Sequence, residues 1–424
     1  MKQDKNCFIC IDLKSFYASV ECVERGFDPF NVNLVVADPT RSKSTICLAI
    51  TPAMKALGVK NRCRIHEIPE NVKYITAMPR MQLYMDYSAR IYGIYLRYFS
   101  KEDIHVYSVD ECFIDVTNYL RLYQLTAKEM AMELMRAVME DTGITATAGV
   151  GTNLYLAKIA MDIVAKHVDD HIGILDEFSF REKLWDHKPL SDFWRIGSRT
   201  EKKLAGYGIH TMGDIAMASF YSEEWFYKTF GIDAELLIDH AWGMESCRMS
   251  DIKNYHSEEH SLSNGQVLMR NYSFDEALVI VKEMTDNLVL DLVDKGLVTN
   301  SITLWITYDY RFEHEDSKGT TKFADANNRS REIIEAVARL YRRIADRHTG
   351  IRRLDVCANR VIPEGYMQFT LFDDPMQTEK ERNPQQAVLE VKHRYGKNAI
   401  MRGMNLLDCS TYRERNDQIG GHRA

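Results

Sequence analysis

The sequence predicts an α/β (α+β) protein of several domains, and three observations support this fold class. Strand-like apolar runs alternate with segments of helical spacing through the first third of the chain. The middle of the chain is helical with short loops, and a second series of strands and helices follows a polar stretch. With 424 residues, 45% of them hydrophobic and 27% charged, the chain is long enough for about two to four globular domains.

The opening of the chain predicts a strand, a helix and a hairpin. Residues 7–12 form a short apolar run, which is typical of a strand buried on both faces. Residues 16–24 have helical spacing. Two β-rich runs, 104–109 and 112–116, are separated by Asp110 and Glu111, and this arrangement predicts a hairpin.

The next segments complete a first α/β layer. Thr126 and Glu129 form a capping box that opens a helix, and this helix is expected to end near Gly143. Residues 144–150 predict a strand and residues 154–164 a helix. The sequence therefore predicts a layered α/β unit with acidic residues at the ends of its strands.

Residues 173–243 predict short helices joined by short loops. Glycine-containing turns at 195–199 and 206–209 bracket one of these helices. Such paired turns suit a hairpin whose backbone N–H groups approach a phosphate, but glycines are also what ordinary helix ends require. Both interpretations stay open. The polar stretch 244–255 is expected to be a linker.

A second α/β unit is predicted beyond the linker. Ser273 and Glu276 form another capping box. The predicted order is strand, helix, two strands, helix and strand, over residues 262–270, 273–296, 301–308, 320–324, 329–347 and 354–361. The polar chain after Pro363 is expected to be a flexible tail.

Hydropathy, charge and cysteine content narrow the function classes. No apolar run reaches about 18 residues and no secretory signal opens the chain, so we expect a cytoplasmic protein without a membrane span. The net charge of −7 argues weakly against nucleic-acid binding, although residues 329–353 are rich in arginine. Cys7 and Cys10 lie in an apolar run, which favours burial over metal binding.

Three carboxylates stand out by their positions. Asp12 closes a predicted buried strand, and Asp110 and Glu111 lie between two strands that are expected to pair with it. Acids at the edge of an apolar sheet are costly unless they coordinate cations or find donors. Two Mg²⁺ ions about 3.5–4 Å apart, shared by carboxylates, suit in-line phosphoryl transfer. The alternative is that each acid lies at an ordinary surface turn.

Three motifs carry a resemblance to a known family. They are residues 11–21 (IDLKSFYASVE), residues 107–115 (YSVDECFID), and TAGVGTN at 147–153 followed by LAKIA at 156–160. They resemble the shared motifs of Y-family DNA polymerases. The resemblance runs from about residue 6 to residue 372. The most similar subgroup is the UmuC/ImpB/MucB/SamB type, the bacterial polymerases of damage-induced mutagenesis.

The resemblance implies a right-hand polymerase fold. Its parts would be a palm, small fingers, a helical thumb of helix-hairpin-helix type and a βαββαβ little finger. In order, the palm covers residues 1–30 and 77–170, the fingers 31–76, the thumb 171–243, the linker 244–255, the little finger 256–362 and the tail 363–424.

The resemblance also implies the reaction. It is DNA-directed, low-fidelity translesion synthesis on primed template DNA from deoxynucleoside triphosphates, in SOS-type repair. Asp12 and Asp110 would bridge two Mg²⁺ ions, and Glu111 would hold the ion nearer the primer terminus. The backbone carbonyl of Leu13 would add a ligand.

Four further residues would bind the nucleotide. Tyr17 matches the steric-gate position, where an aromatic ring fills the space that a ribose 2′-hydroxyl would need. The backbone N–H of Phe16 would meet the triphosphate. Lys55 and Lys166 match basic positions that contact the phosphates.

Three positions depart from the family pattern. Pro52 stands where many members have a tyrosine that touches the phosphates, and Ser15 stands where several carry an aromatic residue or cysteine. Lys166 is one residue further from Lys158 than the pattern expects. These departures leave nucleotide affinity and selectivity open.

The tail contains a further motif, QFTLF at residues 368–372, which resembles the peptide that docks bacterial polymerases on the sliding clamp. Gln368 would anchor this peptide through hydrogen bonds, Leu371 and Phe372 would fill an apolar pocket, and Phe369 belongs to the same motif. Some UmuC-like subunits act only with a processed partner, so the need for a UmuD-like protein stays open.

Three alternatives to a polymerase are considered. A nucleotide cyclase would use similar acids but would need no steric gate, thumb or little finger. A two-metal nuclease would attack with water. A catalytically silent DNA- or clamp-binding accessory subunit would have no use for the three acids.

Overall fold

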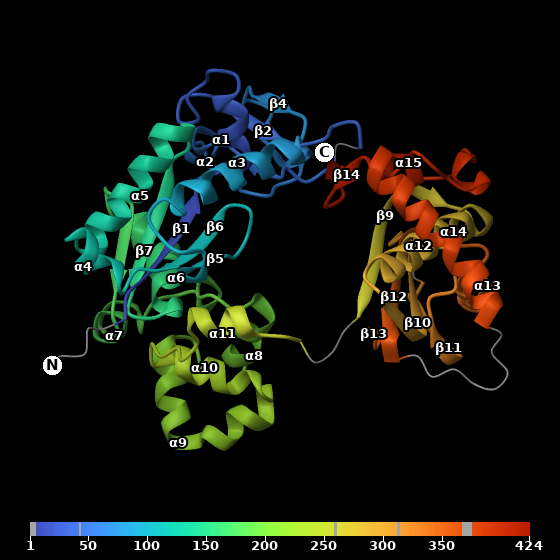
Figure 1. The fold of residues 1–424 in the computed structure, drawn as a ribbon. Helices are drawn as coiled ribbons and strands as arrows, with labels where there is room; N and C mark the ends of the chain where they lie inside the picture. Colours follow the sequence, from blue (N-terminus) through green and yellow to red (C-terminus); the bar gives the residue numbers. More distant parts are fainter. Residues whose placement is uncertain (1–5, 42–43, 258–260, 312–313, 367–374) are drawn as a thin grey trace. The chain divides into compact units, whose positions relative to one another are not determined.

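The computed structural model describes residues 6–41, 44–257, 261–311, 314–366 and 375–424. The chain divides into two compact units, Met1–Tyr255 and His256–Ala424 (Figure 1). Among the described residues, no helix combines the length and apolarity that a membrane span requires.

A five-stranded sheet forms the centre of the first unit, with β1 as its middle strand (Figure 1). The strand order is β5 (Ile104–Val106), β6 (Glu111–Asp115), β1 (Phe8–Leu13), β7 (Ala146–Gly151) and β8 (Ile172–Leu175). β1 is antiparallel to both neighbours, and all of its residues except Asp12 are buried. The predicted two-faced burial of this strand is therefore confirmed.

The predicted hairpin forms, with one correction. β5 ends at Val106, and Glu111 is the first residue of β6 rather than part of the connecting loop. The cause is the register of β6 on β1, because Glu111 pairs with Asp12 and extends the ladder by one residue.

Two helices, α5 (Ala127–Thr142) and α6 (Leu154–Asp162), pack on this sheet. The predicted capping box is confirmed, because the Thr126 hydroxyl accepts the backbone N–H of Glu129, and Gly143 ends α5 with a φ of 70°. α6 lies very close to β7. A Cβ atom added to Gly151 would lie 2.2 Å from the Ala157 nitrogen, so the sheet and helix can approach this closely only because residue 151 is glycine.

A small separate sheet lies beside the central one, and the sequence pattern does not predict its strands. It consists of β3 (Ala49–Ile50), β2 (Leu34–Val36) and β4 (Ile75–Ala77), accompanied by α2 (Pro52–Ala56). Helices α1 (Phe16–Val23) and α3 (Met81–Tyr95) contact each other next to it. Strands of two or three residues are too short for a periodicity signal.

The helical region comprises α7 (Glu177–Leu184), α8 (Ser198–Ala205), α9 (Met212–Phe230) and α10 (Asp233–Ala241). The expected linker is wrong in part, because α11 (Met249–Asn254) forms within it. Met249 is buried against Phe8 and Met161, and Lys253 Nζ donates to the Ile104 carbonyl at 2.7 Å. These tertiary contacts order a segment whose own pattern is weak.

The second unit has the predicted element order. Its sheet runs β11 (Ser317–Asn327), β10 (Leu297–Tyr308), β12 (Ile351–Asn359) and β9 (Leu262–Tyr272). Helices α12 (Phe274–Asp294) and α13 (Ser330–Ile344) share one apolar core with the sheet. Ser273 and Glu276 form the predicted capping box.

The flexible tail expected after Pro363 is wrong for residues 375–424. They form α14 (Pro375–Tyr395), α15 (Tyr412–Asn416) and the ribbon β14 (Gln418–Ile419)–β15 (His422–Arg423). Arg402 donates to both carboxylate oxygens of Asp286 at 2.8 Å, and Asn405 donates to Glu283 at 3.2 Å. Both acids are buried on α12, so the tail supplies donors that they need.

We predict that Gly151→Ala destabilises the first unit, because the new methyl group would overlap the backbone of α6. Overpacking of this kind costs about 1–3 kcal/mol or more. The matched control is Gly93→Ala in α3, where an added Cβ meets nothing within 4 Å, and where alanine should be neutral or stabilising. Thermal unfolding measures both variants, and equal melting temperatures would contradict the close packing of α6 on β7.

Candidate active site

The register of β1 and β6 brings two of the predicted acids together. Asp12 on β1 pairs directly with Glu111 on β6. Because side chains alternate along a strand, both point to the sheet face that carries Phe8 and Phe113, and this face packs against α6. Asp110 precedes β6, and its carbonyl accepts the backbone N–H of Leu13 at 2.9 Å. All three acids therefore lie at one end of the sheet.

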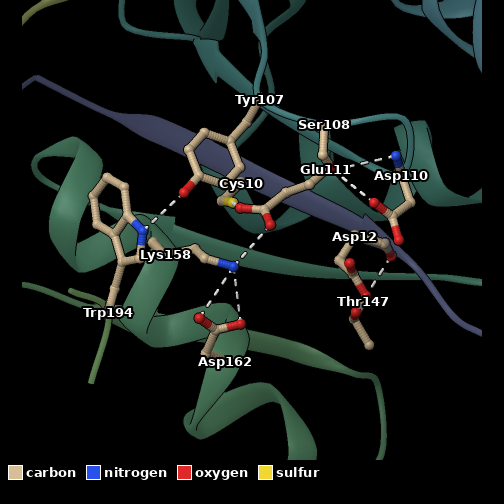
Figure 2. Close-up of polar contacts among 10 residues, drawn as sticks. All are labelled: Cys10, Asp12, Tyr107, Ser108, Asp110, Glu111, Thr147, Lys158, Asp162 and Trp194. Atoms are coloured by element: carbon tan, nitrogen blue, oxygen red, sulfur yellow. Dashed lines mark hydrogen bonds and ion pairs between the residues drawn. The ribbon is translucent and has the colours of Figure 1, made fainter. Parts of the chain in front are cut away.

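Asp12 has a strongly raised pKa. Burial is the largest cause, the charges of Asp110 and Glu111 act in the same direction and Lys158 opposes them, and together they bring the pKa of Asp12 to about 7. Asp110 accepts a hydrogen bond from the Ser108 hydroxyl at 2.6 Å (Figure 2). Within the described part of the chain, neither Asp12 nor Asp110 has an ion-pair partner within 4.0 Å.

Glu111 is held by partners of its own. Lys158 Nζ on α6 donates to one carboxylate oxygen at 2.8 Å, and the Cys10 thiol donates to the other at 3.3 Å (Figure 2). Lys158 also contacts Asp162 at 3.1 Å. Burial raises the pKa of Glu111, and Lys158 opposes this effect. The carboxylate of Glu111 thus faces α6, and no group of three His, Cys, Asp or Glu side chains among the described residues has a metal-binding arrangement.

The two residues after Ser15 begin α1 beside these acids. Ser15 adopts a φ of 50° and is the N-cap, and Phe16 is the first helical residue, where N–H groups have no acceptor within the helix. Tyr17 is half-buried. Burial raises the pKa of its hydroxyl, and so does Asp110, whereas Arg62 lowers it. Tyr17 therefore lies within electrostatic reach of the acids.

Lys55 lies on α2, and Lys166 lies on the short helix Val164–His167. Burial lowers the pKa of Lys55, Asp12 raises it and Lys166 lowers it. Lys55 therefore interacts electrostatically both with Lys166, the other predicted phosphate-binding lysine, and with Asp12.

Sequence reasoning missed three cations at this site, namely Lys14, Arg62 and Lys158. Burial lowers the pKa of Lys14, and Lys55 lowers it further, so these two lysines are neighbours. We call Lys14, Lys55, Arg62 and Lys166 the basic rim. Lys14 lies inside the first motif and could have been noticed there, but the position of Arg62 beside Tyr17 depends on the tertiary fold.

The residues of the predicted clamp motif, Gln368, Phe369, Leu371 and Phe372, lie outside the described residues.

Comparisons with known proteins identify the family. The profile of the impB/mucB/samB family matches residues 11–162, and that of its C-terminal domain matches residues 259–371. The proposed UV-damage repair protein UvrX of Bacillus subtilis is 28% identical over 98% of this chain and 97% of its own length. DNA polymerase IV 2 of the same organism is also 28% identical, over 100% of both chains.

Solved structures share the fold. A Y-family DNA polymerase chimera of Dbh and Dpo4 superposes with a TM-score of 0.64 at 22% identity, covering 84% of this chain and 99% of its own. An insertion ternary complex of Dbh DNA polymerase gives a TM-score of 0.53 at 21% identity over the same shares. Together the two family profiles match more than half of the sequence. The chain therefore belongs to the impB/mucB/samB family and has the fold of the Y-family DNA polymerases.

Proposed function

We propose that this chain is a DNA-directed DNA polymerase that performs low-fidelity translesion synthesis in SOS-type repair. One observation carries the proposal: among the described residues, Asp12 and Asp110 have no ion-pair partner within 4.0 Å, and Asp12 interacts electrostatically with Lys55 of the basic rim. Acids and bases that lack ion-pair partners within the part of the chain that the structure describes suit a substrate that brings both metal ions and phosphates. Relatives named DNA polymerase IV support the same reaction.

The donor set fits divalent cations. Burial and the neighbouring charges of Asp110 and Glu111 raise the pKa of Asp12, although Lys158 opposes them, and hard carboxylate oxygens are ligands that Mg²⁺ prefers. We propose that Asp12 and Asp110 hold two Mg²⁺ ions, and that Glu111 and the Leu13 carbonyl are additional ligands. Bound Mg²⁺ would make the primer hydroxyl a better nucleophile and neutralise the leaving pyrophosphate. Lys158 would keep Asp162 as its partner if Glu111 turned to the metal.

The chain's own residues would bind the nucleotide. Lys55, Lys166 and the backbone N–H of Phe16 would hold the triphosphate, with Lys14 as an additional cation. In the reaction, the primer 3′-oxygen bonds to the α-phosphorus, the bond to the β-phosphate oxygen breaks, and pyrophosphate leaves. Tyr17 would lie against the sugar and exclude a 2′-hydroxyl.

The domain assignment is part of the proposal. We assign the palm to residues 1–30 and 77–170, the fingers to 31–76, the thumb to 171–243 and the little finger to 256–362. Among the described residues, this fingers segment contains the short strands β2, β3 and β4, the one-turn helix α2 and a three-residue helical turn, Ile65–Glu67. So small a subdomain would enclose the nascent base pair loosely, which suits a polymerase that accepts damaged templates.

The partners follow from the same proposal. They are primed template DNA, deoxynucleoside triphosphates and the sliding clamp, the last bound through residues 368–372. A UmuD-like protein is a further candidate partner, and we place the protein in the cytoplasm.

We predict that the protein extends a primer across an abasic site, and that Asp12→Asn abolishes extension. Loss of groups that merely orient a metal ligand costs about 10–100-fold, so loss of the ligand should cost more than about 100-fold. Asp115→Asn is the matched control, because it changes a carboxylate on the neighbouring strand β6, opposite Phe8 and away from the site.

Each alternative function gives a different result in this assay. Shortening of the DNA would indicate a nuclease, and a cyclised nucleotide formed without template would indicate a cyclase. DNA binding without extension, even with clamp and a UmuD-like partner present, would indicate an accessory subunit. Any of these outcomes in the wild-type protein would overturn the proposed polymerase.

We predict that Asp12 makes the metal-free protein less stable as the pH rises. Its pKa is about 7 in the folded chain and 3.8 as the ordinary value, so the folded chain holds a proton that the unfolded chain has released. The free energy of unfolding therefore falls between pH 4 and pH 7. Asp12→Asn removes this dependence and should be more stable than the wild type at pH 8, but not near pH 4.

Thermal unfolding in chelator at several pH values measures this difference. Added Mg²⁺ at pH 8 should raise the melting temperature of the wild type more than that of Asp12→Asn, because only the wild type has the full ligand set. A stability difference that does not change with pH would contradict the raised pKa.

We predict that replacing Leu371 and Phe372 by alanine weakens capture of the protein by immobilised clamp, because the apolar anchors of the peptide are lost. Extension without clamp should stay nearly intact. Thr370→Ala is the control within the same motif. Equal loss of clamp capture and clamp-independent extension would contradict a docking role.

A further inference from the structure

One face of the Tyr17 ring is covered by a second tyrosine. Tyr84 on α3 stacks on Tyr17 with ring centroids 4.5 Å apart and planes inclined by 18°. The two helices that carry them contact each other, as Figure 1 shows for α1 and α3. Tyr84 is fully buried, whereas Tyr17 is half-buried. Tyr84 is thus the inner layer of the pair.

The hydroxyl of Tyr84 is fixed as well as its ring. It donates to Glu21 Oε1 at 2.8 Å. Glu21 lies one turn after Tyr17 on α1, so both side chains stand on the same face of that helix. Tyr84 therefore contacts α1 at two points, through its ring face at Tyr17 and through its oxygen at Glu21.

Glu21 is itself held by cations. Arg80, the residue before α3, donates to both carboxylate oxygens at 2.9 Å, and Arg25 also pairs with Glu21. Burial raises the pKa of Glu21, but the hydrogen bonds from Arg80, Tyr84 and Arg25 outweigh it and lower the pKa. Glu21 has 0% of its surface exposed. Because its pKa is lowered, this buried carboxylate is charged.

Apolar packing alone does not account for this arrangement. A leucine could fill the space between the helices without a buried charge, and buried ion pairs rarely add net stability over apolar residues. A bidentate pair and a short hydrogen bond do fix positions and angles, because each donor must point at its acceptor. The network therefore restricts where the Tyr84 ring can lie, and with it the ring that stacks on it.

The Tyr17 hydroxyl lies within electrostatic range of the site, because Asp110 raises its pKa and Arg62 lowers it. The Tyr17 ring itself lies against Tyr84. A ring that excludes a ribose 2′-hydroxyl must keep its position when the sugar approaches. A second ring packed behind it prevents it from moving away.

We infer that Tyr84, anchored by Glu21 and Arg80, is a positioning residue that holds the Tyr17 ring in place and so sets the discrimination between deoxyribose and ribose. This role rests on the proposed function of Tyr17 as the sugar gate. Tyr84 touches no substrate and acts only through Tyr17.

The test is the ratio of deoxynucleotide to ribonucleotide incorporation, from single-nucleotide kinetics, for a matched set of variants. Tyr17→Ala should lower this ratio at least about tenfold, in the range that one mismatched group in a pocket costs. Tyr84→Met fills the volume with a flexible apolar chain but offers no ring face, and it should lower the ratio at least about threefold. Tyr84→Phe keeps the ring face but loses the hydrogen bond to Glu21, so its ratio should lie between those of the wild type and Tyr84→Met.

Two further measurements separate positioning from general loss of structure. In the Tyr17→Ala background, Tyr84→Met should not lower the ratio further, because its effect passes through Tyr17. Arg80→Gln changes a partly exposed residue and leaves no buried void, so it tests the anchor even if Tyr84→Met does not fold. It should lower the ratio while deoxynucleotide incorporation is largely kept.

The outcomes are distinct. An unchanged ratio in Tyr17→Ala would remove the sugar gate itself. A lowered ratio in Tyr17→Ala combined with an unchanged ratio in Tyr84→Met or, where that variant does not fold, in Arg80→Gln would overturn the positioning role and leave the gate intact.

Discussion

The site depends on one constraint, the register that sets Asp12 directly opposite Glu111 at one end of the central strand β1, which is buried on both faces. Like charges in directly opposed positions destabilise a sheet, and burial adds to the cost. The chain can tolerate this only where cations reach the carboxylates. Gly151 brings α6 close enough to β7 for Lys158 to reach one of them, and the end of the sheet leaves the other open to the site.

The chain treats its two opposed acids differently, and the difference indicates their roles. Glu111 has a lysine and a thiol as donors, so its charge is compensated within the protein. Asp12 has no such compensation, and its pKa is raised to about 7. The opposite charges that could balance it belong to the basic rim, which itself holds Lys14 and Lys55 close together at a cost. A metal-bound triphosphate would neutralise both groups of charges, because its metal ions would pair with the acids and its phosphates with the lysines and arginine of the basic rim.

The features that could be predicted from sequence are those with a local cause. The strand ending at Asp12 is recognisable from its apolar run, and the helices opened by Thr126 and Ser273 from their capping boxes. The structure of the segments between these elements could not be predicted from their own sequence. Strands β2, β3 and β4 are too short for a periodic pattern, and α11 owes its order to Met249 packing on a sheet distant in sequence. At the site, the family motifs point to the acids and Tyr17, but the partner of Glu111 depends on how α6 meets the sheet.

Buried acids on helices explain why the sequence did not predict some of the structured segments. Glu21 on α1 and Asp286 on α12 sit where a hydropathy pattern expects apolar residues, and each is satisfied by an arginine remote in sequence, Arg80 and Arg402 respectively. A polar tail looks disordered when its composition is considered alone, because it cannot bury enough apolar surface. The tail of this chain folds because the second unit already contains acids that need donors. At α1 a buried acid with remote donors also affects the site. One of the donors to Glu21 is the hydroxyl of Tyr84, whose ring stacks on Tyr17. Buried charge in this protein therefore fixes the positions of segments that apolar packing alone would leave free to shift.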